Sequence, residues 1–277
     1  IMKICSPPDS QSKPILFFDS GIGGLPYAVQ ARAALPGEEI VYLADRLGFP
    51  YGTKPREAVT KFVLSAIHTA VRAFSPKVVV VACNTATEIA IQTLREHFPE
   101  LPFIGTVPAV KPAAERTKNG KIAVIATNRA VSEAYLDDLA IKHAASCSLL
   151  KIGASPLVSW IEDELFQADS QTRKEAIQPY VDQVRTFGAD MLILGCTHFL
   201  HLYEQFTEAC SPEITVVDSR DGITKRLATV LESQNLESGR LIPVQEHSFW
   251  VTGGEPVEKR YTIFAQESGF TFRGVLS

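Results

Sequence analysis

Short apolar runs alternate with longer amphipathic stretches along almost the whole chain. Residues 78–81 are four consecutive valines, a pattern typical of a strand that is buried on both faces of a parallel sheet. Residues 55–74 instead repeat apolar side chains at helical spacing on one face. Further strands are expected at 15–18, 40–45, 103–107, 121–127, 148–153, the start of 191–206, 214–219 and 248–253. Further helices are expected from Leu25, after Cys83, and at 131–143, 154–166, 175–190, 222–234 and about 256–267. This alternation predicts a mostly parallel α/β architecture.

Cys83 stands where the valine strand ends and a helical pattern begins. Thr85 and Glu88 have the spacing of a capping box, which predicts that Thr85 caps this helix. The thiol is therefore expected between the carboxyl end of a strand and the amino end of a helix. Ligands bind at this place in open α/β sheets, and the helix end stabilises a thiolate. Taken alone, the position is explained better by a buried structural cysteine than by a catalytic one.

A second strand, cysteine and helix pattern occurs at residues 191–206. Cys196 follows Cys83 by 113 positions, and Thr127 follows Asp19 by 108 positions, each at the end of an apolar run. Two equivalent thiols on equivalent turns predict a duplicated architecture. We expect two pseudo-symmetric α/β lobes with mostly parallel sheets and an active site in the cleft between them.

The expected organisation has three parts. Residues 1–13 are polar and proline-rich and are predicted to be loose. The first lobe is predicted to comprise 14–107 together with 220–277, and the second lobe 108–219. Pro108 and Pro112 mark the predicted crossover between the lobes.

Composition excludes several classes of function. A net charge of −4 without a cluster of basic residues argues against nucleic-acid binding. The longest apolar run, about six residues at 78–83, is far too short to span a membrane. Five cysteines, an odd number with two on candidate functional turns, indicate a reducing compartment. The polar start is unlike a signal peptide, so a cytoplasmic location is expected.

Two further turns could contact a ligand. The first, residues 19–24, is rich in glycine but lacks the spacing of a dinucleotide-binding loop. Asp19 in this turn would repel a phosphate and suits a ligand ammonium or a cationic partner. The second turn contains Pro50, Tyr51 and Gly52, which offer a fixed kink, an aromatic hydroxyl and an accessible backbone. An ordinary surface turn explains these three residues equally well.

A pair of thiols in one cleft could serve redox chemistry, metal binding, covalent catalysis or acid/base catalysis. The absence of a CxxC motif weakens the redox interpretation. The spacing of Cys196, His198 and His201 is unlike that of zinc sites, so no metal is predicted. No arginine follows either cysteine as a thiol phosphatase requires, since Ile89 and Leu202 occupy those positions.

Acid/base catalysis fits the duplication best. Two opposed groups can remove a proton from one face of a carbon and return one to the other face, which inverts a stereocentre. A free thiol titrates near ~8.5, and a helix amino end or a nearby cation is expected to bring it toward neutrality. A two-lobed amino-acid-binding protein without chemistry is the alternative from another class.

Four motifs resemble those of the glutamate racemases in the aspartate/glutamate racemase superfamily. They are DSGIGGL at 19–25, PYG at 50–52, ACNTAT at 82–87 and LGCTH at 194–198, and the resemblance spans about residues 14–235. It implies an isomerase that interconverts L- and D-glutamate without pyridoxal phosphate or any other cofactor. It also implies a supply of D-glutamate for peptidoglycan, and so a role in cell-wall synthesis and cell shape. Aspartate racemase is the nearest rival, because it shares two opposed thiols.

The resemblance further implies a role for each matched residue. Cys83 and Cys196 are the two catalytic acid/base groups, with Cys83 acting on D-glutamate and Cys196 on L-glutamate. Asp19 and His198 assist them, one beside each cysteine, and Glu162 matches a family acid near the second half-site. The residues implied to bind substrate are Asp19, Ser20, Pro50, Tyr51, Gly52, Asn84, Thr85, Thr127, Thr197 and His198.

The chain also departs from the family pattern. Ala130 replaces a threonine that the family usually has, which removes a hydroxyl near the ligand. Residues after about 235 match the family poorly. The stretch VPAVKPA at 107–113 resembles the branch whose enzymes respond to a cell-wall nucleotide precursor, so such an effector is a predicted partner. The oligomeric state is left open, with a homodimer as one alternative.

Overall fold

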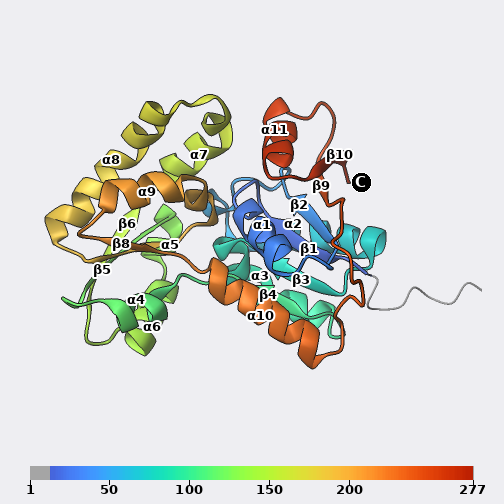
Figure 1. Cartoon of the computed structure of the whole chain (residues 1–277), viewed down its shortest axis with the longest axis horizontal. Coiled ribbons are helices and arrows are strands. Elements are labelled where there is room, and N and C mark those ends of the chain that lie inside the picture. The colour runs from blue at the N-terminus through green and yellow to red at the C-terminus, as the bar shows by residue number, and fades with distance from the viewer. Residues whose placement is uncertain (1–12, 277) are drawn as a thin grey trace, which may run out of the picture.

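The chain forms two α/β lobes that lie side by side (Figure 1). The computed structural model describes residues 13–276, so the predicted loose segment 1–13 falls outside them except for Lys13. Every strand pair in the described residues is parallel. The predicted α/β class with mostly parallel sheets is confirmed.

The first sheet has six strands in the order β10-β9-β2-β1-β3-β4. Their bounds are β1 (Ile15–Asp19), β2 (Ile40–Ala44), β3 (Val78–Val81), β4 (Phe103–Gly105), β9 (Ser248–Val251) and β10 (Thr271–Val275). The valines of β3 are completely buried, as their uninterrupted run predicted. The helices of this lobe are α1 (Leu25–Ala34), α2 (Arg56–Phe74), α3 (Asn84–His97), α10 (Arg220–Ser233) and α11 (Lys259–Glu267).

The second sheet has four strands in the order β6-β5-β7-β8. Their bounds are β5 (Lys121–Ala126), β6 (Ser148–Gly153), β7 (Met191–Leu194) and β8 (Thr215–Val217). The helices are α4 (Val110–Arg116), α5 (Asn128–Ser132), α6 (Ala134–His143), α7 (Ser155–Asp163), α8 (Ser170–Phe187) and α9 (Tyr203–Cys210). This order repeats the order β2-β1-β3-β4 of the first sheet, so β1 corresponds to β5 and β3 to β7. The predicted pseudo-symmetry therefore appears in the strand topology.

Two long helices, α2 and α8, compare with their sequence-based predictions as follows: the apolar face of α2 is confirmed, and α8 begins five residues before the predicted start at 175. The face of α2 that the apolar spacing predicted packs against the first sheet, and Val59, Val63 and Ile67 on it are fully buried. The helix α8 begins after Asp169, whose carboxylate accepts a hydrogen bond from the Thr172 backbone at 2.8 Å. It ends at Gly188, which adopts the left-handed conformation that glycine accommodates readily at a helix C-terminus.

The predicted capping box after Cys83 is wrong. Cys83 itself occupies the N-cap position, and Thr85 lies inside the first turn of α3. Glu88 pairs with Arg56 at 3.0 Å instead of reaching back to the helix start. The hydroxyl of Thr87 donates to the Val81 carbonyl at 3.1 Å, which ties the first turn of the helix to the end of its strand.

Three other details differ from the sequence-based expectation. The helix predicted at 131–143 is divided into α5 and α6 at Glu133, whose backbone is extended. Cys196 is followed by a 3₁₀ helix, Thr197–Leu202, before α9 begins. The strand β10 was not predicted, and it joins the first sheet through β9. The exact division of the chain between the two lobes stays a prediction.

Candidate active site

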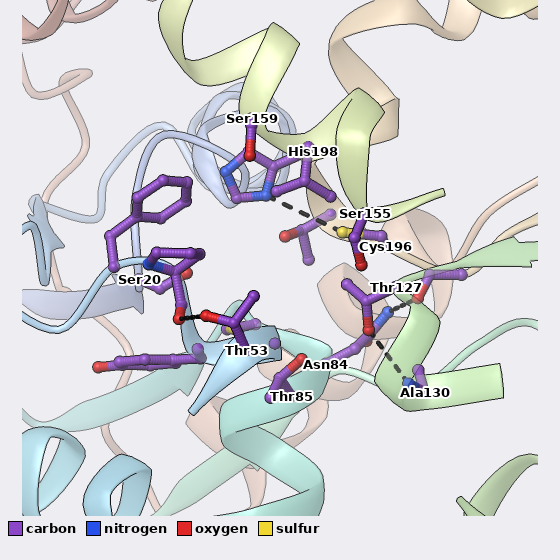
Figure 2. Close-up of a pocket in the computed structure, with 18 residues that line it drawn as sticks. Ser20, Thr53, Asn84, Thr85, Thr127, Ala130, Ser155, Ser159, Cys196 and His198 are labelled. Atoms are coloured by element: carbon purple, nitrogen blue, oxygen red, sulfur yellow. Dashed lines mark hydrogen bonds between the residues drawn. The ribbon is translucent and has the colours of Figure 1, made fainter. Parts of the chain in front are cut away.

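The duplicated topology brings the two cysteines to one cavity between the lobes. Cys83 follows β3 at the amino end of α3, and Cys196 follows β7 at the start of the 3₁₀ helix. Both side chains are buried, at 6% and 7% exposure, yet both border the same cavity of about 60 Å³. Figure 2 shows side chains from both lobes converging on this space.

Most of the residues that the sequence singled out line the cavity. These are Ser20, Pro50, Tyr51, Gly52, Cys83, Asn84, Thr85, Thr127, Cys196, Thr197 and His198. Asp19 and Glu162 do not line it, because both are completely buried behind the lining residues.

Sequence reasoning missed part of the lining. The missed residues are Phe49, Thr53, Ser155, Val158, Ser159 and Gly195. Ser155 and Ser159 are four positions apart on α7, the spacing that places two side chains on one helix face. The sequence could have indicated these two serines, because they lie on one face of the helix that also carries the predicted site residue Glu162. Ala130 also lines the cavity, as its departure from the family pattern suggested.

The half-site around Cys83 contains a buried carboxylate. Asp19 accepts hydrogen bonds from the Ser20 hydroxyl at 3.1 Å and from the Thr197 hydroxyl of the other lobe at 3.0 Å. Burial raises the pKa of Asp19, against the opposing effect of the His198 charge. Burial also raises the pKa of the Cys83 thiol well above its usual value, and the Asp19 charge raises it further.

The pKa of Cys83 corrects one expectation. A helix amino end was expected to bring the thiol toward neutrality, and the Ala86 backbone N–H does act in that direction. Desolvation and the neighbouring carboxylate outweigh this contribution. Burial of the thiol is thus the main difference between this cysteine and a simple helix-end thiolate, and the charge of Asp19 adds to it.

The half-site around Cys196 contains a buried imidazole and a second carboxylate. His198 Nδ1 lies 3.9 Å from the Cys196 sulfur, and His198 Nε2 lies 2.9 Å from Glu162 Oε2. Burial lowers the pKa of His198, but its contacts with Cys196 and Glu162 raise it well above the usual value. Burial likewise raises the pKa of Glu162, and the hydrogen bond with His198 more than reverses this shift. The arrangement therefore favours an imidazolium beside the sulfur.

The glycine-rich turn after β1 is explained by close packing between the lobes. A Cβ at Gly21 would lie only 2.6 Å from Glu162 Oε2, and a Cβ at Gly23 would collide with the His198 ring. The backbone N–H of Ile22 donates to Glu162 at 3.2 Å. The turn thus receives the acid and the imidazole of the opposite lobe, and its glycines are needed for that approach.

Two other cross-connections shape the cavity. The Asn84 amide donates to the Gly195 carbonyl at 2.6 Å, which joins the two cysteine turns directly. The Tyr51 hydroxyl donates to the buried carboxylate of Asp45 at 2.5 Å. The Tyr51 hydroxyl was expected to face a ligand, but it is hydrogen-bonded to Asp45 instead. The Tyr51 side chain still borders the cavity, although it is buried.

Within residues 13–276, no group of three or more side chains is arranged to hold a metal ion. None of the helices in the same part of the chain combines the length and the apolar character that a membrane crossing requires.

Comparison with known proteins identifies the family. The sequence profile of the Asp/Glu/Hydantoin racemase family matches residues 25–227. The chain belongs to this family. It is 38% identical over 229 residues to a glutamate racemase of Sphingopyxis alaskensis, covering 82% of this chain and 85% of the relative. It is also 38% identical over 218 residues to one of Agrobacterium fabrum, covering 77% and 79%.

Solved structures agree with this assignment. A glutamate racemase of Escherichia coli, in complex with L-glutamate and the activator UDP-MurNAc-Ala, superposes with a TM-score of 0.84 at 29% identity over 96% of this chain and 98% of that one. One of Thermus thermophilus, in complex with β-chloro-D-alanine, gives a TM-score of 0.74 at 28% identity over 96% and 97%. The resemblance to glutamate racemases, and with it the predicted class of isomerase, is confirmed.

Proposed function

We propose that this racemase interconverts L- and D-glutamate by proton transfer between two thiols and that it supplies D-glutamate for peptidoglycan. The observation that carries the proposal is the pair Cys83 and Cys196, which border one cavity from opposite lobes. A single base could remove the α-proton but would return it to the same face. Two opposed thiols can invert the centre.

The two directions use the same groups in opposite order. With L-glutamate, the Cys196 thiolate takes the α-proton as the C–H bond breaks, and the Cys83 thiol donates its proton to the other face of the carbon. With D-glutamate, the roles are exchanged. Only protons move and no group changes its oxidation state, so the step balances without a redox partner. His198 lies beside Cys196 and can stabilise its thiolate.

The charges around the cavity suit an amino acid. The amino end of α3, a helix of 14 residues, carries Asn84 and Thr85 and favours a carboxylate. Asp19 lies behind Ser20 and suits the substrate ammonium. A bound ammonium would also offset the Asp19 charge that raises the pKa of Cys83, so substrate binding itself would help to form that thiolate.

A racemisation assay with isotope exchange tests this function. The purified protein, without added pyridoxal phosphate or metal, should change the circular dichroism of L-glutamate and of D-glutamate toward zero. In deuterated solvent, both enantiomers should gain deuterium at the α-carbon. A preference for aspartate would favour the rival substrate, and binding of glutamate by calorimetry without deuterium exchange would favour a protein that binds without chemistry. Complete dependence on an added cofactor would contradict the two-thiol mechanism.

We further propose that a nucleotide precursor of the cell wall regulates the enzyme from a second cavity. This cavity has a volume of about 860 Å³, and VPAVKPA at 107–113 forms part of its wall. The basic residues that line it are Lys111, Arg116, Arg220, Lys225 and Arg226. Such a set suits the diphosphate of the activator that is present in the Escherichia coli structure.

The regulatory proposal has its own test. A UDP-linked muramyl precursor should raise the racemisation rate, and Lys111→Glu should weaken this response while the basal rate stays the same. Lys61→Glu, an exposed change on α2, is the control for the reversed charge. An unchanged rate in the presence of the precursor would remove this proposal and leave the racemase function intact.

A further inference from the structure

The C-terminal segment 248–275 reaches the active site although it lies outside the family match at 25–227. It adds β9 and β10 to the edge of the first sheet, and α11 connects them. Figure 1 shows α11 at the top of the first lobe, across from α7 of the second lobe. The segment contributes one buried hydroxyl behind each cysteine half-site.

Behind Cys196, this hydroxyl belongs to Tyr261 of α11. It donates to Glu162 Oε1 at 3.0 Å, while Glu162 Oε2 faces His198. Tyr261 and Glu162 are both completely buried. The Glu162 carboxylate is therefore fixed from both sides. Its Oε1 accepts a hydrogen bond from the C-terminal segment, and its Oε2 contacts the His198 imidazole. The preceding residue, Arg260, pairs with Asp163 at 2.7 Å and docks the same two helices.

Behind Cys83, the corresponding hydroxyl belongs to Thr252, at the end of β9. It donates to Asp45 Oδ1 at 2.5 Å, while Asp45 Oδ2 accepts the hydrogen bond from Tyr51. Tyr51 borders the cavity and packs in the same buried cluster as Cys83. Here too a buried carboxylate joins the C-terminal segment on one side to a cavity residue on the other.

We propose that Tyr261 and Thr252 are positioning residues, each of which orients one half-site through a shared buried carboxylate. Tyr261 acts through Glu162 and His198 on Cys196, and Thr252 acts through Asp45 and Tyr51 on the Cys83 side. A buried carboxylate that loses one donor can turn, and small errors in the orientation of a catalytic group reduce its rate strongly. This inference rests on the proposed two-thiol function.

A one-sided reaction distinguishes the two half-sites. Racemisation uses both thiols in each direction, so it cannot report on one alone. Elimination from β-chloroalanine requires only removal of the α-proton: the proton goes to the thiolate, the C–H electrons form the Cα=Cβ bond, and chloride leaves with its electron pair. The enamine hydrolyses to pyruvate, which is measured. The L-enantiomer reports on Cys196 and the D-enantiomer on Cys83.

The variants Tyr261→Phe and Thr252→Val should give opposite patterns. Tyr261→Phe should lower kcat/KM for elimination from the L-enantiomer roughly tenfold and change the D-reaction little, by the loss of one oriented hydrogen bond to a charged group. Thr252→Val should slow the D-reaction and spare the L-reaction. Thr252→Ser, which keeps the hydroxyl, should restore the D-reaction.

Matched controls separate positioning from docking of the segment. Asp163→Asn removes the neighbouring ion pair of Arg260 without touching Glu162 and should leave the ratio of L- to D-elimination unchanged. Tyr180→Phe makes the same chemical change on α8, away from the cavity. If Tyr261→Phe and Thr252→Val slow both enantiomers equally, the C-terminal segment is only structural and the inference is wrong. If the variants of Cys83 and Cys196 themselves show no enantiomer preference, it is the two-thiol function that fails.

Discussion

The two cysteine half-sites share one backbone arrangement but place opposite charges beside the sulfur. Each cysteine ends the third strand of its lobe and begins a helix. Burial raises the pKa of the Cys83 thiol, and the neighbouring buried carboxylate of Asp19 raises it further. Cys196 lies next to His198, whose raised pKa keeps a positive charge available. The duplication therefore fixes where the sulfur atoms lie, and the residues that are not duplicated set the charge beside each sulfur.

The largest expected effect separates the two thiols. Cys83→Ser and Cys196→Ser should each lose racemisation in both directions, by roughly 10²–10⁴-fold, because a serine hydroxyl is too weakly acidic to act as the base. Cys83→Ser should still eliminate chloride from the L-enantiomer of β-chloroalanine, and Cys196→Ser from the D-enantiomer. If both variants process both enantiomers equally, the thiols are not opposed bases.

The other cysteines provide the control for this experiment. Cys5, Cys147 and Cys210 lie outside the four matched motifs, so the sequence predicts that serine at these positions changes the kinetics little. Cys147 is only partly buried and remains the suitable control. Cys210 is completely buried, and burial raises its pKa to about 11. We therefore expect Cys210→Ser to lower stability, so it is a poor control. Cys5 lies outside the described residues.

The next effect concerns the stability of the second half-site. The lowered pKa of Glu162 stabilises the fold above about 4.3, and this contribution is lost as the pH falls through the folded pKa. The raised pKa of His198 stabilises the fold fully below about 6.5, and this contribution is lost as the pH rises through the folded pKa. The pair should thus contribute most between these two values.

The variant Glu162→Gln tests whether the pair stabilises the fold most between these two pH values. The variant should lose about 3–5 kcal/mol of unfolding free energy near pH 5.5, because a buried charged partner is left alone. The loss should shrink toward alkaline pH, as measured by denaturant unfolding. Glu164→Gln, an exposed neighbour, is the control and should change little at any pH. A loss for Glu162→Gln that grows with pH would mean that His198 is neutral in the folded protein.

Asp19→Asn addresses the first half-site. Removal of the carboxylate charge should lower the pKa of Cys83, so iodoacetamide should alkylate this thiol faster at a fixed pH. Racemisation should nevertheless fall, by about tenfold, because the substrate ammonium loses its counter-charge. Mass spectrometry of the Cys83 peptide measures the alkylation, with Asp182→Asn on α8 as the control. Slower alkylation at Cys83 would contradict the assigned cause of its raised pKa.

The smallest effect concerns Ala130. A hydroxyl at this cavity position can add one hydrogen bond to the ligand, worth about 0.5–1.5 kcal/mol. Ala130→Thr should therefore lower KM for glutamate by roughly two- to tenfold, whereas Ala130→Val, which has the same shape without the hydroxyl, should not. Equal effects of the two variants would show that volume, not hydrogen bonding, matters at this position.

The sequence by itself determined the architecture and the two thiols. The uninterrupted valines of β3 and the repeated strand, cysteine and helix pattern are local signals, because burial on both faces and helical periodicity act over short stretches of chain. They were sufficient to predict parallel sheets, the duplication and a shared cavity. The strand β10 escaped prediction, because its alternate residues are exposed and it is defined by pairing with β9.

Only the tertiary structure decided which charged groups lie near the two cysteines. No local pattern shows that Asp19 lies behind Cys83, that Glu162 reaches His198 from another helix, or that Tyr261 holds Glu162 across 99 positions of sequence. The capping-box prediction was wrong for the same reason: Glu88 forms an ion pair with Arg56, a residue from another helix. A pKa depends on burial and on charges brought together by folding, so the sequence could place the thiols but could not predict the raised pKa of Cys83.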